Sequence, residues 1–403
     1  MEDKHPSSET VPVVGHVEKR INRYYLKISR KYMSAGIFFM LSLIVYIMFV
    51  MAFFGKYVTY ESLRYLVRDI GAVSLREGGS FEGIVYNAEG TLTGTSFRGG
   101  LALYSGDNYY YYDSSGTLLI EDSPGYSSPS MAASGKYLLL YDVGGNGYTV
   151  FNQLTSIITR TSAGRIVAGD IADDGSMLLL TRSKETKYVA ELYNSAFVKV
   201  MSIYKENYAV DAALSPDGKF AVIASAIPEE TDITCEITIC ERGQSEPIFK
   251  TTYSHTMPLS LEACEGGFIM LCDNGIYFFD YSGGIKSSLG FGGMTLAYAS
   301  MSEKSACVVG QVNALGNENR YIAFSSDGEI LCDSIYDERV NGAYASLNTD
   351  DALMYLRTTD KLVKINSLGE YEEHIPEREM LSVVPTENGV LVCTPGSAYK
   401  AFE

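Results

Sequence analysis

The chain has 403 residues, of which 46% are hydrophobic and 20% are charged, a composition typical of a folded globular protein with a large core. Its net charge of −17 is unevenly distributed: residues 1–34 carry +3, residues 35–54 carry no charge, and residues 55–403 carry −20. Because a strongly acidic domain repels phosphate groups, we do not expect nucleic acid to be a partner.

The first predicted element is a transmembrane helix at residues 35–54. This stretch reads AGIFFMLSLIVYIMFVMAFF, and about twenty apolar residues of helix cross the hydrocarbon core of a bilayer. A cleaved signal peptide is the alternative, but its charged region is usually short and small residues follow its apolar stretch. Here 34 residues precede the apolar stretch, and no cleavage site made of small residues follows it. This pattern favours an uncleaved signal anchor.

The charges beside this stretch predict its orientation. Six Lys or Arg residues lie within residues 19–31, and cations are sparser after the span. The positive-inside rule therefore places residues 1–34 in the cytoplasm as a basic tail and residues 55–403 outside the cell membrane. Apolar residues at helical spacing then predict a juxtamembrane helix and linker at residues 55–79.

From about residue 80, short β-rich segments alternate with Gly, Asp, Asn and Ser. One turn, made of small or acidic residues before an apolar strand, recurs along the chain and is clearest at Ser215-Pro216-Asp217-Gly218-Lys219. Its copies are marked by residues 100, 135, 175, 218, 267, 305, 351 and 389, on average about 41 residues apart. A second turn, often with Asx and Gly that tolerate positive φ, follows in each repeat.

Two tight turns divide each repeat into about four strands, and four strands per ~40 residues make one blade of a β-propeller. We therefore predict an all-β propeller at residues 80–403, with eight four-stranded blades, or seven if one weak copy is an insertion. The last repeat supplies only three strands. Residues 81–87 form an extra N-terminal strand, which we expect to close the last blade and so remove an open sheet edge.

The turn at residues 215–219 resembles those of the YVTN and WD-type propeller superfamily. With the juxtamembrane stretch Ser62-Leu63-Arg64-Tyr65-Leu66-Val67-Arg68, the plan of residues 20–403 resembles an uncharacterised family of membrane-anchored β-propellers of Clostridia-like bacteria. These motifs are structural turns, so the resemblance implies a fold and an anchor and says little about activity. The WD dipeptide and the Gly-His signature of eukaryotic repeats are absent.

No catalytic, cofactor or metal motif stands out. The four histidines form no HExxH or HxH pattern, and GxSxG is absent. The carboxylate pairs Asp173-Asp174 and Asp350-Asp351 fall on the repeated turn and lack the spacing of a calcium loop. We therefore interpret them as turn formers, expect no cofactor or metal, and infer no catalysis.

Two further residue sets are interpreted as core. The seven cysteines lie mostly in apolar, strand-like stretches and are expected to be buried small hydrophobic residues. The run Tyr109-Tyr110-Tyr111-Tyr112 is expected to form a strand, so that its side chains alternate between two faces and half of them pack between blades.

Loop lengths predict a binding face. Connections between the second and third strands of a blade all lie on one face, and the longest are residues 227–232 in the fourth blade and 311–319 in the sixth. Long polar loops on a rigid scaffold are the usual place for binding. The candidate binding residues are Glu229, Glu230, Asp232, Asn313, Asn317 and Asn319.

We hypothesise a single-pass, extracytoplasmic propeller that acts as a binding or scaffold module for a protein or cell-envelope partner. One alternative is a propeller enzyme acting on envelope polymer, which would require convergent carboxylates or histidines near the central channel. Another is a ligand sensor that signals through the single helix. Because propellers support unrelated functions, the fold does not choose among these hypotheses.

Overall fold

The computed structural model describes residues 28–46, 48, 83–86, 92–244, 246–312 and 318–402. The chain divides into two compact units, residues 1–78 and 79–403. They are described separately below.

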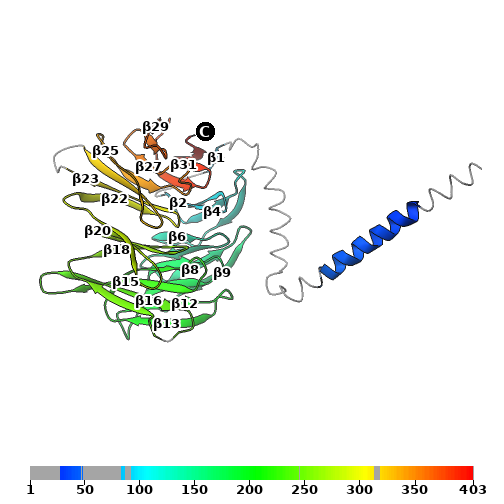
Figure 1. Ribbon diagram of the computed structural model, residues 1–403, viewed down its shortest axis with the longest axis horizontal. Coiled ribbons are helices and arrows are strands. Elements are labelled where there is room, and N and C mark those ends of the chain that lie inside the picture. The colour runs from blue at the N-terminus through cyan, green and yellow to red at the C-terminus, as the bar shows by residue number, and fades with distance from the viewer. Residues whose placement is uncertain are drawn as a thin grey trace, which may run out of the picture. The chain divides into compact units, whose positions relative to one another are not determined.

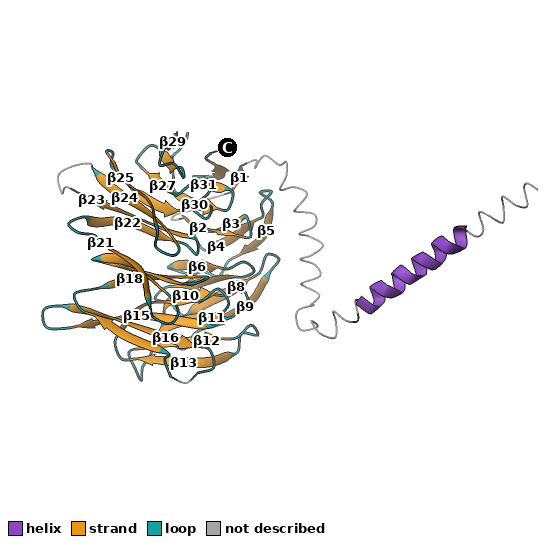
Figure 2. Ribbon diagram, in the orientation of Figure 1, coloured by secondary structure: helices purple, strands orange, loops and turns teal. Residues whose placement is uncertain are grey.

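In the first unit the described residues form one helix, Ile28–Tyr46 (Figure 2). It is long and apolar enough to cross a membrane, and its apolar stretch is not buried against any other described part of the chain. The predicted span at residues 35–54 therefore overlaps a helix that begins earlier in the chain. Residues 47 and 49–54 of that span, and the predicted juxtamembrane helix at 55–79, lie outside the described residues.

The described residues of the second unit form eight four-stranded antiparallel sheets, numbered here as blades 1–8 (Figure 1). Blades 1–4 contain β2 (Leu92–Phe97), β3 (Gly100–Ser105), β4 (Asn108–Tyr112), β5 (Leu118–Asp122); β6 (Pro129–Ala133), β7 (Leu138–Asp142), β8 (Gly147–Phe151), β9 (Ser156–Thr161); β10 (Ile166–Ile171), β11 (Met177–Arg182), β12 (Tyr188–Tyr193), β13 (Lys199–Lys205); and β14 (Tyr208–Leu214), β15 (Phe220–Pro228), β16 (Ile233–Glu241), β17 (Phe249–Tyr253).

Blades 5–8 contain β18 (Pro258–Cys264), β19 (Gly267–Cys272), β20 (Gly275–Phe279), β21 (Ile285–Gly290); β22 (Thr295–Met301), β23 (Ser305–Gln311), β24 (Asn319–Ser325), β25 (Ile330–Tyr336); β26 (Gly342–Ala345), β27 (Met354–Arg357), β28 (Leu362–Ile365), β29 (Tyr371–His374); and β30 (Ser382–Thr386), β31 (Gly389–Thr394), β32 (Ser397–Lys400), with β1 (Ile84–Val85). The strand order in blades 1–7 follows the chain.

In most pairs of neighbouring blades the first strands contact one another, as β10 contacts β14 and β14 contacts β18, and blades 5 and 6 share an apolar cluster. The contacts include β30 with β2, so the blades form a ring and their first strands surround the propeller axis. The prediction of eight blades is confirmed, and the alternative of seven is wrong.

Blade 8 is closed by the N-terminal strand, as predicted. Its order is β1-β32-β31-β30, and Ile84 pairs with Ala398. Ile84 is only 2% exposed and packs with Leu391 and Cys393, whereas the neighbouring Val85 is 81% exposed. The described closing strand is two residues long, shorter than the predicted 81–87.

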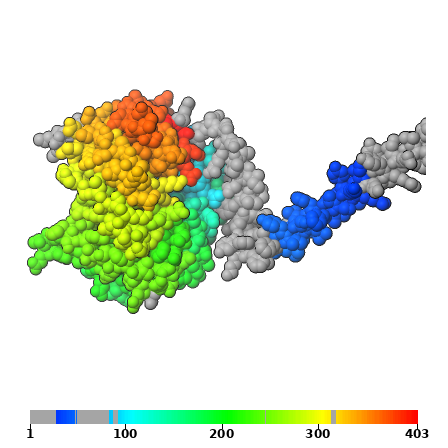
Figure 3. Space-filling model, in the orientation of Figure 1, coloured from blue at the N-terminus to red at the C-terminus, as the bar shows by residue number. Residues whose placement is uncertain are grey.

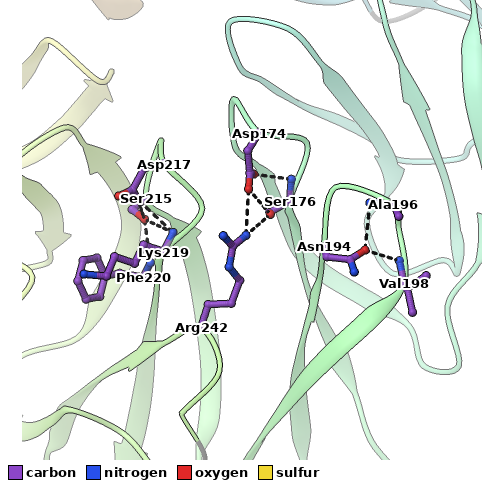
Figure 4. Close-up of polar contacts among 10 residues, drawn as sticks. All are labelled: Asp174, Ser176, Asn194, Ala196, Val198, Ser215, Asp217, Lys219, Phe220 and Arg242. Atoms are coloured by element: carbon purple, nitrogen blue, oxygen red, sulfur yellow. Dashed lines mark hydrogen bonds and ion pairs between the residues drawn. The ribbon is translucent and has the colours of Figure 1, made fainter. Parts of the chain in front are cut away.

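Side-chain hydrogen bonds fix the repeated turns (Figure 4). In blade 4, Asp217 Oδ1 accepts hydrogen bonds from Ser215 Oγ at 2.6 Å and from the Lys219 backbone nitrogen at 3.0 Å. In blade 3, Asp174 Oδ1 accepts a hydrogen bond from the Ser176 backbone nitrogen at 2.7 Å, and its Oδ2 lies 2.9 Å from Arg242 Nη1 of blade 4. Asp174 is therefore a turn former, as predicted, and in addition joins two blades.

The core is a set of apolar clusters between adjacent blades. Tyr109 and Tyr111 pack into the cluster shared with blade 2, while Tyr110 and Tyr112 pack into the cluster shared with blade 8. All four tyrosines therefore contribute to inter-blade packing, more than the predicted half. The seven cysteines are free thiols, and all are buried except Cys332, which is half-buried. Their interpretation as core residues is confirmed.

Candidate functional site

The candidate site lies on the face that carries the connections between second and third strands and the connections between successive blades, named here the loop face. Blade 4 is the prominent blade on this face because β15 and β16 have nine residues each and pair as far as Pro228 with Ile233. Figure 1 shows this hairpin projecting at the left of the propeller, where Figure 3 shows it as a light green protrusion. The predicted long loop at 227–232 is therefore shorter in the structure, because residues 227–228 end β15 and only residues 229–232 form the turn.

The predicted residues of this turn are on the surface. Glu229 and Glu230 are exposed and Asp232 is half-exposed. Glu229 Oε1 accepts a hydrogen bond from Thr234 at 2.9 Å. Asp232 Oδ2 lies 2.6 Å from His255 Nδ1 and accepts a hydrogen bond from the His255 backbone nitrogen at 3.0 Å. Two carboxylates are thus presented to solvent, and the third ties the turn to the connection that follows blade 4.

The predicted residues of blade 6 do not form a described group of exposed side chains on the loop face. Asn313 and Asn317 lie outside the described residues. Asn319 is in β24, is 4% exposed, and donates its amide to the Glu338 carbonyl oxygen at 2.8 Å. Its side chain therefore supports the connection between blades 6 and 7 instead of facing solvent.

Sequence reasoning missed the residues that connect this turn to blade 5. The amide of Asn274 donates to the His255 carbonyl oxygen at 2.8 Å and to Thr256 Oγ1 at 3.0 Å. The Met257 backbone nitrogen donates to Asp273 Oδ1 at 2.8 Å. Residues 229–232, 255–259 and 273–274 therefore form one hydrogen-bonded surface, named here the platform. An Asp-Asn pair between two strands was the only sequence signal, and it is common in turns.

A second polar group lies near the propeller axis. Asp170 in β10 accepts hydrogen bonds from its neighbour Ile171 and from Leu214 of β14, both through backbone nitrogens. Asp211 in β14 repeats this arrangement with Ala212 and with Leu261 of β18. Each carboxylate therefore joins its own blade to the next.

Burial shifts the pKa values of these acids upward. It raises the pKa of Asp170 to about 7 and of Asp211 to about 6, with the backbone donors opposing the shift. The pKa of Glu262 in β18 is raised well above its ordinary range by burial and by the charges of Asp170, Glu303 and Asp211. Asp170, Asp211, Glu262 and Glu303 belong to four successive blades, 3–6. Their charges are close enough to raise the pKa of Glu262 because the blades converge near the axis.

Metal and histidine chemistry has little support in the part of the chain that the structure describes. There, no group of three or more His, Cys, Asp or Glu side chains is placed to hold a metal ion. His255 is 85% exposed in its ion pair, and His374 lies 3.2 Å from Tyr399 Oη. The two described histidines therefore contribute to separate local contacts.

Comparison with protein families gives one match, which covers residues 84–400 and so the whole propeller. The chain belongs to the family of unknown function DUF5711. No curated protein matches the chain. The region that defines the family therefore coincides with the propeller, and family membership assigns no activity.

The solved structures that resemble this DUF5711 chain are distant from it in sequence. BamB from Moraxella catarrhalis matches with a TM-score of 0.52 at 10% identity, covering 79% of this chain and 98% of that one. A structure of a eukaryotic initiation factor matches with a TM-score of 0.50 at 12% identity, covering 80% and 85%. The Pan2 WD40 domain of Neurospora crassa has a TM-score of 0.46 at 5% identity, covering 79% and 90%. At these identities the likeness concerns the fold alone.

Proposed function

We propose that the chain is a membrane-anchored scaffold whose propeller lies outside the cytoplasm and binds a protein or cell-envelope partner through its loop face. The observation that carries this proposal is the platform. It is a rigid, hydrogen-bonded surface that presents Glu229, Glu230 and apolar side chains to solvent. Rigid scaffolds that display such groups on connecting segments are the usual architecture of binding proteins.

The anchor in this proposal is the N-terminal helix. The helix Ile28–Tyr46 has the length and the apolar composition of a membrane span. The cations at residues 19–31 support a cytoplasmic N-terminus, because positive charges flank the cytoplasmic end of such spans. The basic tail at 1–34 and the linker at 55–79 complete this arrangement.

The proposal is tested by site-specific photo-crosslinking in cells. A photoreactive residue replaces Thr231 on the loop face in one variant and Asn388, in a turn on the opposite face, in a second variant; both side chains are exposed. We expect a discrete crosslinked species from position 231 and none from position 388. Equal products from the two positions, or no product from position 231, would contradict a loop-face partner.

The carboxylates near the axis support a second candidate function, the cleavage of an envelope polymer by a hydrolase or lyase reaction. Of the group, Asp170 and Asp211 are bonded to backbone donors, and Glu262 has no side-chain hydrogen bond to any described residue. A carboxylic acid with a raised pKa is suited to donate a proton at neutral pH. Under this candidate, the wild-type chain releases soluble fragments from purified envelope polymer and Glu262→Gln does not. Absence of release by the wild type would exclude it.

A further inference from the structure

The blade 4 hairpin and blade 5 differ in height on the loop face. β15 has nine residues, whereas β19 of blade 5 has six and turns at residues 273–274. Three extra residues of strand at ~3.3 Å each extend the hairpin about 10 Å further. The platform is therefore a step, with the hairpin tip as its wall and residues 255–259 and 273–274 as its floor.

The step is held in place without a partner. Asp232 fixes the hairpin tip to His255, and Asn274 fixes His255 and Thr256 to blade 5. The Thr256 backbone nitrogen also donates to the Ile233 carbonyl oxygen at 3.0 Å. A partner that binds here does not have to order these segments, so less free energy is lost on association.

The step is acidic. The segments 227–234, 254–261 and 272–275 contain four acidic residues, one histidine (His255, paired with Asp232) and neither Lys nor Arg, and the segment 290–298 adds no charged residue. Within the described residues, Glu229 and Glu230 have no ion-pair partner. A cationic partner would supply the missing charges and would be attracted at long range.

Apolar side chains accompany these acids. Met257 and Leu259 on the floor are 37% and 38% exposed. Leu259 occupies a β-bulge between Pro258 and Ser260, and bulges commonly re-aim a side chain next to a binding site. Partly exposed Met and Leu beside carboxylates match a ligand that has both apolar and cationic side chains.

We infer that the step between the blade 4 hairpin and blade 5 binds a basic, amphipathic segment of a partner protein. Its Lys or Arg residues contact Glu229 and Glu230, and its apolar residues contact Met257 and Leu259. This inference rests on the proposed function, because it names the partner class for the same face, and it excludes an uncharged envelope polymer as the occupant of this step.

Binding of labelled peptides to the full chain in nanodiscs of neutral lipid tests the inference, with empty nanodiscs subtracted. The probes are an amphipathic peptide of leucine and lysine, its leucine–glutamate counterpart, and a serine–lysine peptide of equal charge. We expect only the leucine–lysine peptide to bind well, with an affinity that falls as salt is added. The variant E229K/E230K should lose about tenfold in affinity. The matched variant E265K/E387K, which reverses two exposed acids in turns of the opposite face, should bind as the wild type does.

The apolar contribution has its own pair of variants. Leu259→Ser should weaken binding of the leucine–lysine peptide, whereas Ile285→Ser, at a 50% exposed position on outer strand β21, should not. Equal binding by E229K/E230K and E265K/E387K, or equal binding of the two leucine peptides, would overturn the inference. If no peptide binds while position 231 still crosslinks to one species in cells, the inference fails and the proposed function stands. If both readouts are negative, both fail.

Discussion

The Oδ2 atom of Asp170 accepts a hydrogen bond of 2.7 Å from the backbone nitrogen of Leu214, which lies in the next blade. Asp211 makes the same kind of bond, of 2.8 Å, to Leu261 one blade further on. These two acids therefore link blades 3, 4 and 5 near the axis. Both have raised pKa values, so the links should make the stability of the propeller depend on pH.

We expect the propeller to become less stable as the pH rises from 5 to 8. A carboxyl whose folded pKa exceeds its unfolded value binds more protons when folded, so the free energy of unfolding falls as pH rises between the two values. That interval runs from 3.8 to about 7 for Asp170 and to about 6 for Asp211. Burial lowers the pKa of His374, so this one group makes the free energy of unfolding rise with pH and opposes the two carboxyls. Thermal unfolding of the full chain across this pH range is the measurement, and a Tm that rises with pH would contradict it.

Replacement of Glu262 by Gln should stabilise the propeller at pH 8 and leave it unchanged at pH 5. Glu262 has no side-chain hydrogen bond to a described residue, and its charge is repelled by Asp170, Glu303 and Asp211. Gln keeps the shape and removes the charge, which the protonated acid already lacks at pH 5. The expected rise in Tm at pH 8 is about 2–4 °C. Asp211→Asn is the control, because an amide nitrogen facing the Leu261 donor should lower Tm at both pH values.

Lys205→Met should destabilise the propeller by about 3 kcal/mol, because removal of one member of a buried ion pair leaves the other charge uncompensated. Lys205 Nζ lies 2.5 Å from Glu236 Oε1 across the boundary of blades 3 and 4, with side chains 5% and 4% exposed. Lys250 and Asn207 also contact Glu236, which keeps the loss at the lower end of the usual range.

Lys199→Met is the matched control for this pair. Lys199 lies on the same strand, β13, and pairs with Glu191 at 2.8 Å; the lysine side chain is 51% exposed, whereas that of Glu191 is 9% exposed. Glu191 also accepts a hydrogen bond from the Tyr193 hydroxyl at 2.9 Å, which remains when Lys199 is removed. Because the lysine itself is solvated, we expect its loss to cost about 1 kcal/mol, less than the loss of Lys205. Denaturant unfolding of both variants measures the difference, and equal losses in the two would show that burial does not govern the Lys205 pair.

Ile84→Asp should open blade 8. Ile84 is buried against Leu391 and Ala398, and a charge there would separate β1 from β32. The adjacent Val85→Asp should have little effect, because Val85 faces solvent. Hydrogen exchange measures the outcome: amides of β32 should exchange faster in Ile84→Asp than in Val85→Asp. Equal protection in the two variants would argue against closure by β1.

The sequence predicts the blades well because each carries two local signals. Turns such as residues 215–219 depend on Ser and Asx side chains that accept hydrogen bonds from the local backbone and on a Gly at positive φ. They can therefore be recognised without long-range information. The tyrosine run 109–112 likewise alternates between two packed faces because a strand requires it. Closure by the N-terminal strand follows from counting strands in the last repeat.

The site residues were harder to predict because their positions depend on register and strand length. The first strands β10, β14 and β18 each contain a bulge, and one extra residue changes which side chains face a neighbouring blade. The meeting of Asp170, Asp211 and Glu262 was therefore not visible in the sequence. The sequence pattern likewise predicts a loop at residues 227–228 and at Asn319, whereas the structure has the end of β15 at the first and the start of the buried strand β24 at the second.

Labelling of single cysteines on intact cells tests the central claim most directly, namely an extracytoplasmic propeller with an accessible loop face. The background is Cys332→Ser, because the other six cysteines are buried. One variant carries Glu230→Cys at the hairpin tip and the other carries Ser7→Cys in the N-terminal tail. We predict that a membrane-impermeant thiol reagent labels Glu230→Cys and spares Ser7→Cys until the cells are permeabilised. Labelling of Ser7→Cys alone would invert the topology and contradict the account.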